Sequence, residues 1–192
     1  MMQTRRIAVF QLDNFQQSPF GKYFSKLARE FLSRGLEVDF LGTSDLGFES
    51  LPEGTHGLLI GQPRGRVPSH FKGIPDLVRY IRDKAPDAII ANGPSFVIAT
   101  AIAKTFARSD VKILANLHSL LSRDIASKAY RGARMYPYIL PLAFRLAHQV
   151  VAVSGHVAED YAQVTGYPRE RIAIQPWFFV TDEDIDGTPS VA

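Results

Sequence analysis

The sequence contains no cysteine, so neither a disulfide framework nor a thiolate metal site can form. Long apolar runs are also absent, because the longest, YPYILPLAF, holds two prolines and falls far short of the roughly 20 residues that cross a bilayer. At the N-terminus, Gln11 and Asp13 interrupt the apolar run and no small-residue cleavage site follows, so no signal peptide is predicted. These absences predict a cytoplasmic protein that is not integral to a membrane.

Several motifs of well-known enzyme classes are missing as well. No G-x-G-x-x-G follows the first predicted strand and no G-x-x-x-x-G-K-[ST] occurs, which disfavours a nicotinamide-dependent dehydrogenase and a P-loop NTPase. There is no G-x-S-x-G turn of a serine hydrolase. The histidines include no H-E-x-x-H and no pair four residues apart, and the D-x-D patterns of TDEDID lie in a polar tail, so we expect no metal site. The histidines are His56, His70, His118, His148 and His156.

The composition is that of a folded chain, since 46% of the 192 residues are hydrophobic and 21% are charged. This length suits one domain, given a soft prior of about 150 residues per domain. We expect a domain over residues 1–180, followed by a polar tail or the start of an interdomain linker over residues 181–192.

Short apolar segments alternate with segments of helical periodicity. In KYFSKLAREFLSRG, apolar residues recur at helical spacing and Gly35 stands where a C-cap glycine belongs. LEVDFLG alternates apolar and acidic residues as a half-exposed strand does, and GLLIG is typical of a short buried strand. The predicted strands span residues 7–12, 36–42, 57–61, 87–92, 111–119 and 150–154, with one more after the Gly-Tyr-Pro break at 166–168. The predicted helices span residues 22–35, 75–85 and 93–108, with two more before the strand at 150–154 and one after it.

Strands that are apolar on both faces and alternate with helices of ten or more residues predict a Rossmann-like α/β fold, a parallel sheet with helices on both faces. In such sheets the ligand lies beyond the carboxyl ends of the strands, where the strand order reverses. The helix starts there also offer free N–H groups and the positive end of a dipole. The strand-to-helix turns in question span residues 13–22, 61–73, 92–95, 118–123 and 154–156.

The segment VVAVSGHVAEDYAQVTGYPRERIAIQPWF resembles part of the family 4 glycosyltransferases of the GT-B fold, where a strand ending in Ser precedes a helix, a Gly-x-Pro turn and a second strand. RIAVFQLDNFQQSPFGKYFSKLAREFLSRGLEVDFLG is similar to the family's first strand, glycine loop, first helix and second strand. APDAIIANGP is similar to its P-D strand, and ILANLHS to its strand that ends in histidine. The loop has one glycine where relatives often have two, and Gln175 stands where Asn is common.

This resemblance implies the acceptor-binding N-terminal half of an enzyme that moves a sugar from a nucleotide-sugar donor to a glycan or lipid-linked acceptor. By position, His118 would be the catalytic residue and would donate a hydrogen bond to a sugar oxygen. Gly21 and Lys22 would lie near the donor phosphates. The residues implied in substrate binding are Phe20, Asn92, Gly93, Ser119, Arg123 and Ser154.

Several of these residues also have a purely structural interpretation. His118 could simply end a strand and donate to a carbonyl group, and Ser154 could serve as a plain N-cap of a helix. Gly21 could serve backbone geometry, while Lys22 and Arg123 could simply be solvated.

The resemblance further implies that the donor-binding half is missing. In the family, the donor nucleotide and a pair of Glu residues eight positions apart belong to a second Rossmann-like domain, and this sequence contains no such pair. We therefore expect no cofactor to bind this chain alone, and a UDP- or GDP-sugar to bind the complete enzyme. The chain would be part of a longer protein or the partner of a separate donor-domain chain, and catalytically silent by itself.

Positive charge is concentrated in one part of the chain. Between Lys104 and Arg145 there are eight Lys and Arg and two Asp, a net +6, so the remainder sums to −3 against a total of +3. The segment SRDIASKAYRGARMYPYILPLAF mixes basic residues with tyrosines, which suits docking on an anionic membrane surface that carries a lipid-linked acceptor. A solvated face beside the cleft explains the same pattern equally well.

Two other classes of function remain open. A non-catalytic binding subunit of a split glycosyltransferase would differ from the enzyme half only in whether a donor-domain partner restores turnover. A nucleic-acid-binding α/β domain is disfavoured, because the basic residues lack a recognition fold and the aromatic residues lie in core-like positions. We therefore expect no nucleic-acid partner.

Overall fold

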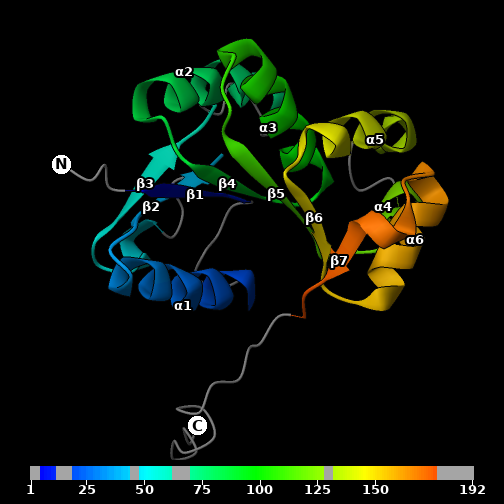
Figure 1. Cartoon of the computed structure of the whole chain (residues 1–192), viewed down its shortest axis with the longest axis horizontal. Helices are drawn as coiled ribbons and strands as arrows, with labels where there is room; N and C mark the ends of the chain where they lie inside the picture. The colour runs from blue at the N-terminus through cyan, green and yellow to red at the C-terminus, as the bar shows by residue number, and fades with distance from the viewer. Residues whose placement is uncertain (1–4, 12–18, 44–47, 62–69, 128–131, 177–192) are drawn as a thin grey trace, which may run out of the picture.

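The computed structural model describes residues 5–11, 19–43, 48–61, 70–127 and 132–176. In this part of the chain, seven parallel strands form one sheet in the order β3-β2-β1-β4-β5-β6-β7 (Figure 1). The strand order reverses between β1 and β4, which are direct neighbours. The strands are β1 (Arg6–Phe10), β2 (Glu37–Gly42), β3 (Thr55–Leu59), β4 (Ala88–Asn92), β5 (Lys112–Leu117), β6 (Gln149–Ala152) and β7 (Ile172–Ile174).

Helices cover the two faces of the sheet unequally. Figure 1 shows α1 on one face and α2, α3 and α5 on the other, and α6 packs against α4 and α5. The predicted Rossmann-like fold is therefore confirmed. The α-helices are α1 (Pro19–Ser33), α2 (Ile74–Lys84), α3 (Pro94–Ala107), α4 (Leu121–Ala126), α5 (Tyr136–Leu146) and α6 (Gly155–Thr165), and single 3-10 turns are η1 (Phe48–Ser50), η2 (His70–Gly73), η3 (Ala133–Met135) and η4 (Arg169–Arg171).

Proline and glycine explain several helix bounds. Both α2 and α3 carry Pro in the first turn, where a missing N–H costs no helical hydrogen bond. Gly35 follows α1 with φ +75°, and Gly166 closes α6 with φ +68°, a conformation that favours glycine. Because α1 begins at Pro19, Gly21 lies inside its first turn, whereas the sequence pattern placed it in the preceding loop.

The sheet is buried on both sides, as a parallel sheet requires. On β4, Ile89 and Ala91 belong to the large core beneath α2, α3, α5 and α6. Ile90 points the other way, into a smaller core with Phe24 of α1 and Phe40 of β2. The alternation of side chains along the strand therefore divides consecutive apolar residues between two cores.

The predicted exposures of β2 and β3 are both wrong. Strand β2 is buried from Val38 to Gly42, including Asp39, which is 0% exposed. The carboxylate of Asp39 can be buried because Arg6 donates to its two oxygens at 2.9 and 2.8 Å. The Tyr80 hydroxyl donates to the same carboxylate at 2.7 Å. Strand β3 lies at the edge of the sheet and leaves His56 exposed, so it is the half-exposed strand.

The predicted tail over residues 181–192, with its TDEDID segment, lies outside the described residues. The domain boundary at residue 180 therefore stays a prediction. No helix in the described ranges is long and apolar enough to cross a membrane.

Candidate functional site

Three buried amide side chains lie at the carboxyl edge of the sheet, where the strand order reverses. Asn92 ends β4 and Asn116 lies opposite it on β5, and the Asn116 Nδ2 donates to the Asn92 Oδ1 at 3.0 Å. Gln11 follows β1, is 3% exposed, and its Oε1 accepts no hydrogen bond from the described residues. These are buried polar groups at the position where an open α/β sheet binds its ligand.

Gly93 brings the His118 ring close to this amide cluster. Its backbone has φ +101°, and its N–H donates to the Asn116 carbonyl at 2.9 Å. A Cβ atom at Gly93 would lie 3.3 Å from the His118 Nε2, a tight contact. The position therefore requires glycine for two reasons, a left-handed backbone and the adjacent imidazole.

The surroundings of His118 favour a neutral imidazole. Burial lowers its pKa from the ordinary value of 6.5, and the Asp124 carboxylate and hydrogen bonding with the Asn92 backbone oppose this effect without reversing it. A neutral imidazole has one N–H donor and one acceptor nitrogen. His118 can thus hydrogen-bond to a hydroxyl group without carrying a charge.

The segment after β5 is held in place by hydrogen bonds from both sides. The Ser119 hydroxyl donates to the Asp124 Oδ2 at 2.7 Å, and the Ser122 N–H donates to the Asp160 Oδ2 of α6 at 3.1 Å. Arg123 is exposed on α4. The loop that carries His118 is therefore tied to α4, and α4 in turn is tied to α6.

The starts of α3 and α6 each offer an anion one N–H group fewer than an uncapped helix without proline does. Helix α3 begins with Pro94, which has no N–H, and its regular hydrogen bonding begins with the Val97 N–H, which donates to the Gly93 carbonyl at 3.0 Å. At α6, the Ser154 Oγ accepts from the Val157 N–H at 3.3 Å, so Ser154 caps the helix. The edge consequently presents mainly neutral hydrogen-bonding groups.

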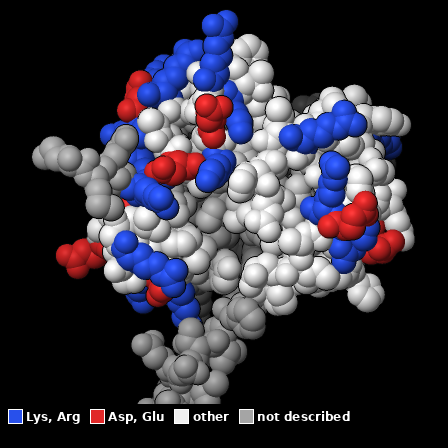
Figure 2. Space-filling view, viewed as in Figure 1, with Lys and Arg blue, Asp and Glu red and all other residues white. Residues whose placement is uncertain are grey.

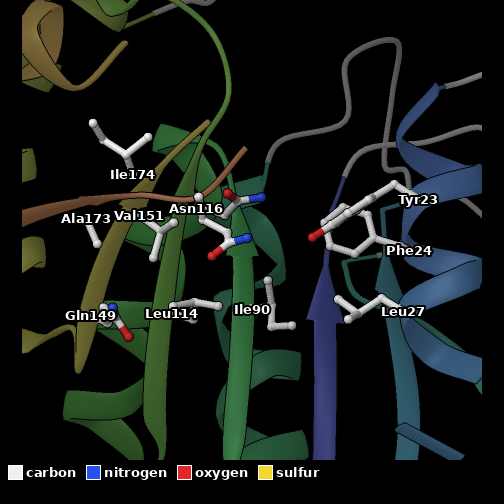
Figure 3. A pocket seen from close by; sticks show the side chains of 11 residues that line it. Tyr23, Phe24, Leu27, Ile90, Leu114, Asn116, Gln149, Val151, Ala173 and Ile174 are labelled. Carbon is white, nitrogen blue, oxygen red and sulfur yellow. The ribbon is translucent and has the colours of Figure 1, made fainter. Parts of the chain in front are cut away.

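An apolar groove adjoins the amide cluster on the α1 face of the sheet. It has a volume of about 220 Å³ and a floor formed by β4 to β7, with Ile90, Leu114 and Val151 among the lining residues. Figure 3 shows the Tyr23 hydroxyl of α1 pointing across the groove toward Asn116. Because Asn116 lines the groove and also pairs with Asn92, the apolar and polar surfaces are continuous.

The structure brings part of the predicted site together. Asn92, Gly93, His118 and Ser119 lie at the ends of the neighbouring strands β4 and β5. The other predicted residues are more scattered. Ser154 follows β6, Gly21 is buried in the first turn of α1, and Arg123 is exposed on α4. The side chains of Phe20 and Lys22 are not among those that the structure describes. The site roles of all these residues stay predictions.

The sequence interpretation missed Gln11, Tyr23, Asn116 and Asp124. A signal existed for Asn116, because DAIIAN and KILAN both end in Ala-Asn and two parallel neighbours align their carboxyl ends. Gln11, the first polar residue after β1, carried a weaker signal. Among the described residues, no group of three His, Asp or Glu side chains could hold a metal ion.

The fold is that of one half of a GT-B glycosyltransferase. Anabaena Alr3699/HepE, solved in complex with UDP and glucose, matches with a TM-score of 0.65 and 19% identity over 90% of this chain and 44% of that one. A glycosyltransferase from Rickettsia africae matches with a TM-score of 0.61 and 11% identity over 90% and 43%, respectively. The lipopolysaccharide outer core galactosyltransferase WaaB matches with a TM-score of 0.61 and 10% identity over 89% of this chain and 45% of that one. The chain spans less than half the length of these proteins.

Residues 21–183 match the family model Glycosyltransferase Family 4, and the chain belongs to this family. The family and fold implied by the sequence motifs are thereby confirmed. No curated protein matches the chain in sequence.

Proposed function

We propose that this chain is the acceptor-binding half of a glycosyltransferase, which transfers a sugar from a UDP- or GDP-sugar to a glycan or lipid-linked acceptor once a donor-binding domain completes it. One observation carries the proposal: a desolvated His118 lies against Gly93, next to the Asn92–Asn116 pair, at the switch point of the sheet.

The chemistry of the carboxyl edge suits a sugar better than a diphosphate. Sugar hydroxyls both donate and accept, as do the amides of Asn92 and Asn116 and a neutral His118. A diphosphate is best held by free helix N-termini or by Arg and Lys, whereas α3 begins with proline and α6 is capped by Ser154. We therefore assign the acceptor sugar to this edge.

The donor phosphates are assigned mainly to the complementary domain. Gly21 and Lys22, in the first turn of α1, are the residues of this chain that we propose to approach them. HepE, whose fold is similar, was solved with UDP and glucose and with UDP-glucose, which supports a uridine diphosphate sugar as the first donor to test.

His118 is proposed to hydrogen-bond to a hydroxyl of the reacting sugars. During transfer, the bond from the anomeric carbon to the diphosphate breaks, the acceptor oxygen forms a bond to that carbon, and the proton of the acceptor hydroxyl passes to the departing nucleoside diphosphate. A neutral, fixed imidazole can orient these hydroxyls, and such positioning contributes because donors need no reorganisation as charge develops. Gly93 permits the close approach, since any side chain there would press on His118.

The test compares the 192-residue chain with an extended protein, in which a donor-binding GT-B domain is joined to this chain. By titration calorimetry with UDP- and GDP-sugars, we expect the shorter chain to bind more weakly than about 1 mM. We expect the extended protein to bind one donor and to release its nucleoside diphosphate when an acceptor is present. His118→Ala in the extended protein should lower kcat about 100-fold, as loss of a proton-handling or positioning group does.

The matched control is His148→Ala, because His148 is exposed and lies at the amino end of β6, away from the carboxyl edge that carries His118. Tight binding of a nucleotide by the shorter chain would refute the assignment of the donor site to another domain. Donor binding by the extended protein without turnover would instead support the non-catalytic subunit.

A further inference from the structure

Most of the exposed large apolar side chains that the structure describes gather on one surface. Seven described residues of this kind are exposed; four of them lie on α3 or α5, and a fifth lies on the η3 turn that leads directly into α5. These five define the α3–α5 surface: Phe106, Met135, Tyr138, Leu142 and Leu146, with exposures of 66%, 53%, 73%, 59% and 42%. Such clustering is unusual for a surface that faces only water.

The spacing on α5 places its apolar residues on one stripe. Tyr138, Leu142 and Leu146 follow one another at intervals of four residues, so they lie on one face over roughly 12 Å of helix. Between this stripe and α3 lies a groove of about 250 Å³ whose lining is almost entirely apolar, with Ile102, Phe106 and Ile139 among its residues. The α3–α5 surface is thus a continuous apolar strip with a shallow groove.

Basic side chains border the strip on both sides. On the α5 side, Arg134 and Arg145 are exposed, and in Figure 2 the surface over α5, at the upper right, is white and blue. Near the far end, the Lys104 Nζ donates to the Leu146 carbonyl at 3.5 Å, and on the α2 side the Arg82 guanidinium donates to the Phe106 carbonyl at 2.8 Å.

Acidic residues are fewer around this strip. Asp83 lies among the residues that line the α2 side, beside Arg79 and Arg82, and Asp76 pairs with Arg79 at 3.4 Å. Arg108, the C-cap of α3, is also exposed. No ion pair between described residues uses Arg82, Lys104, Arg108, Arg134 or Arg145. The surface therefore combines an apolar centre with a basic border.

We propose that the α3–α5 surface docks this protein on a membrane leaflet rich in anionic lipid. Apolar side chains of this size can enter the boundary between headgroups and acyl chains, while the surrounding Arg and Lys contact lipid phosphates. The charge complementarity selects an anionic leaflet over a neutral one. Binding of this kind is reversible, because the apolar side chains reach only the boundary between headgroups and acyl chains.

The placement differs from the one that the sequence suggested. Of the tyrosines in SRDIASKAYRGARMYPYILPLAF, Tyr136 is only 4% exposed and belongs to the core, whereas Tyr138 is exposed. Lys128, Tyr130 and Arg131 lie outside the described residues. The η3 turn at the start of α5 contacts α4, which follows His118, so the docked membrane would border the carboxyl edge of the sheet.

Vesicle flotation tests the proposal without any sugar transfer, and so independently of the proposed function. We expect the chain to bind vesicles of equal parts phosphatidylcholine and phosphatidylglycerol at low salt, and to bind phosphatidylcholine vesicles at least about tenfold more weakly. Arg134→Glu with Arg145→Glu should weaken binding at least about tenfold. Tyr138→Ser with Leu142→Ser should also weaken it, at unchanged net charge.

The matched control is Arg29→Glu with Arg171→Glu, which makes the same change of charge at exposed sites on α1 and η4. Equal losses in the two charge variants would overturn the placement, because they would indicate attraction to net charge alone. Binding to neither vesicle would overturn the proposal. If vesicle binding were absent and ultracentrifugation showed a concentration-dependent dimer that Tyr138→Ser with Leu142→Ser abolishes, the α3–α5 surface would be a dimer interface and the proposal would be overturned.

Discussion

At the scale of single residues, His118 is a group of the candidate site whose protonation depends on its surroundings. In the folded chain its pKa lies below the ordinary value of 6.5 because burial disfavours the imidazolium. The unfolded chain therefore binds this proton at a higher pH than the folded chain does. The contribution of neutral His118 to the free energy of unfolding is fully present above the pKa that His118 has in the unfolded chain. It is lost as the pH falls from there toward the pKa that His118 has in the folded chain.

This sign predicts the pH dependence of stability. We expect the free energy of unfolding, measured by urea denaturation, to decrease as the pH falls from about 7 to about 5, and to decrease less steeply in His118→Gln. His148→Gln, at an exposed position, is the control and should keep the parent slope. Identical slopes in the parent and in His118→Gln would contradict a desolvated His118.

The residue scale also shows why an acidic residue was misjudged. An alternation of apolar and acidic residues in LEVDFLG predicts a solvent-facing Asp39, because a charge without a partner is costly to bury. The partners, Arg6 and Tyr80, come from β1 and α2 and are 33 and 41 residues away in sequence. No local pattern contains them.

At the scale of single elements, α6 shows how a local signal can be read directly. The sequence pattern predicts a helix that begins after Ser154, and the structure confirms both the helix and the cap, with the Ser154 Oγ accepting from the Val157 N–H. Gly166, with φ +68°, ends the helix. Helix bounds depend on neighbours in sequence, so they are predictable from sequence.

Loss of this cap has a predictable cost. Ser154→Ala removes the acceptor of an otherwise unpaired helical N–H, and we expect the free energy of unfolding to fall by about 1 kcal/mol. Ser154→Asp should recover most of the loss, since aspartate is also a good N-cap. Ser122→Ala on α4, whose side chain is exposed, should change stability little. If Ser154→Ala were as stable as the parent, the cap would contribute nothing measurable.

Over the whole molecule, the candidate site and the buried ionic cluster occupy different parts of the sheet. The amides and His118 lie at the carboxyl edge, whereas Arg6 and Asp39 belong to the first halves of β1 and β2. Burial and the hydrogen bond to Asp39 raise the pKa of Tyr80, so its hydroxyl remains a donor across the physiological range. The buried ionic cluster and the candidate site can therefore be perturbed separately.

Tyr80→Phe tests this separation. The variant removes one hydrogen bond to a buried carboxylate, and we expect the free energy of unfolding to fall by about 2 kcal/mol. The dependence of the free energy of unfolding on pH that His118 causes should persist in this variant, because Tyr80 and His118 lie at different places in the sheet. Tyr138→Phe, at a site that is 73% exposed, is the matched control and should leave stability unchanged. A Tyr80→Phe variant as stable as the parent would contradict the importance of the buried network.

The sequence by itself determined the order of strands and helices, the helix caps and the family, because these depend on periodicity, on Pro and Gly, and on motifs that are contiguous along the chain. The tertiary structure decided which residues share a site. Asn116 pairs with Asn92 because β4 and β5 are parallel neighbours in register, and Gly93 meets His118 because their strands end at the same edge. It also decided that Phe106 and Leu142 form one apolar surface, since α3 packs on α5. Such contacts depend on how the elements pack, which no single stretch of the sequence specifies.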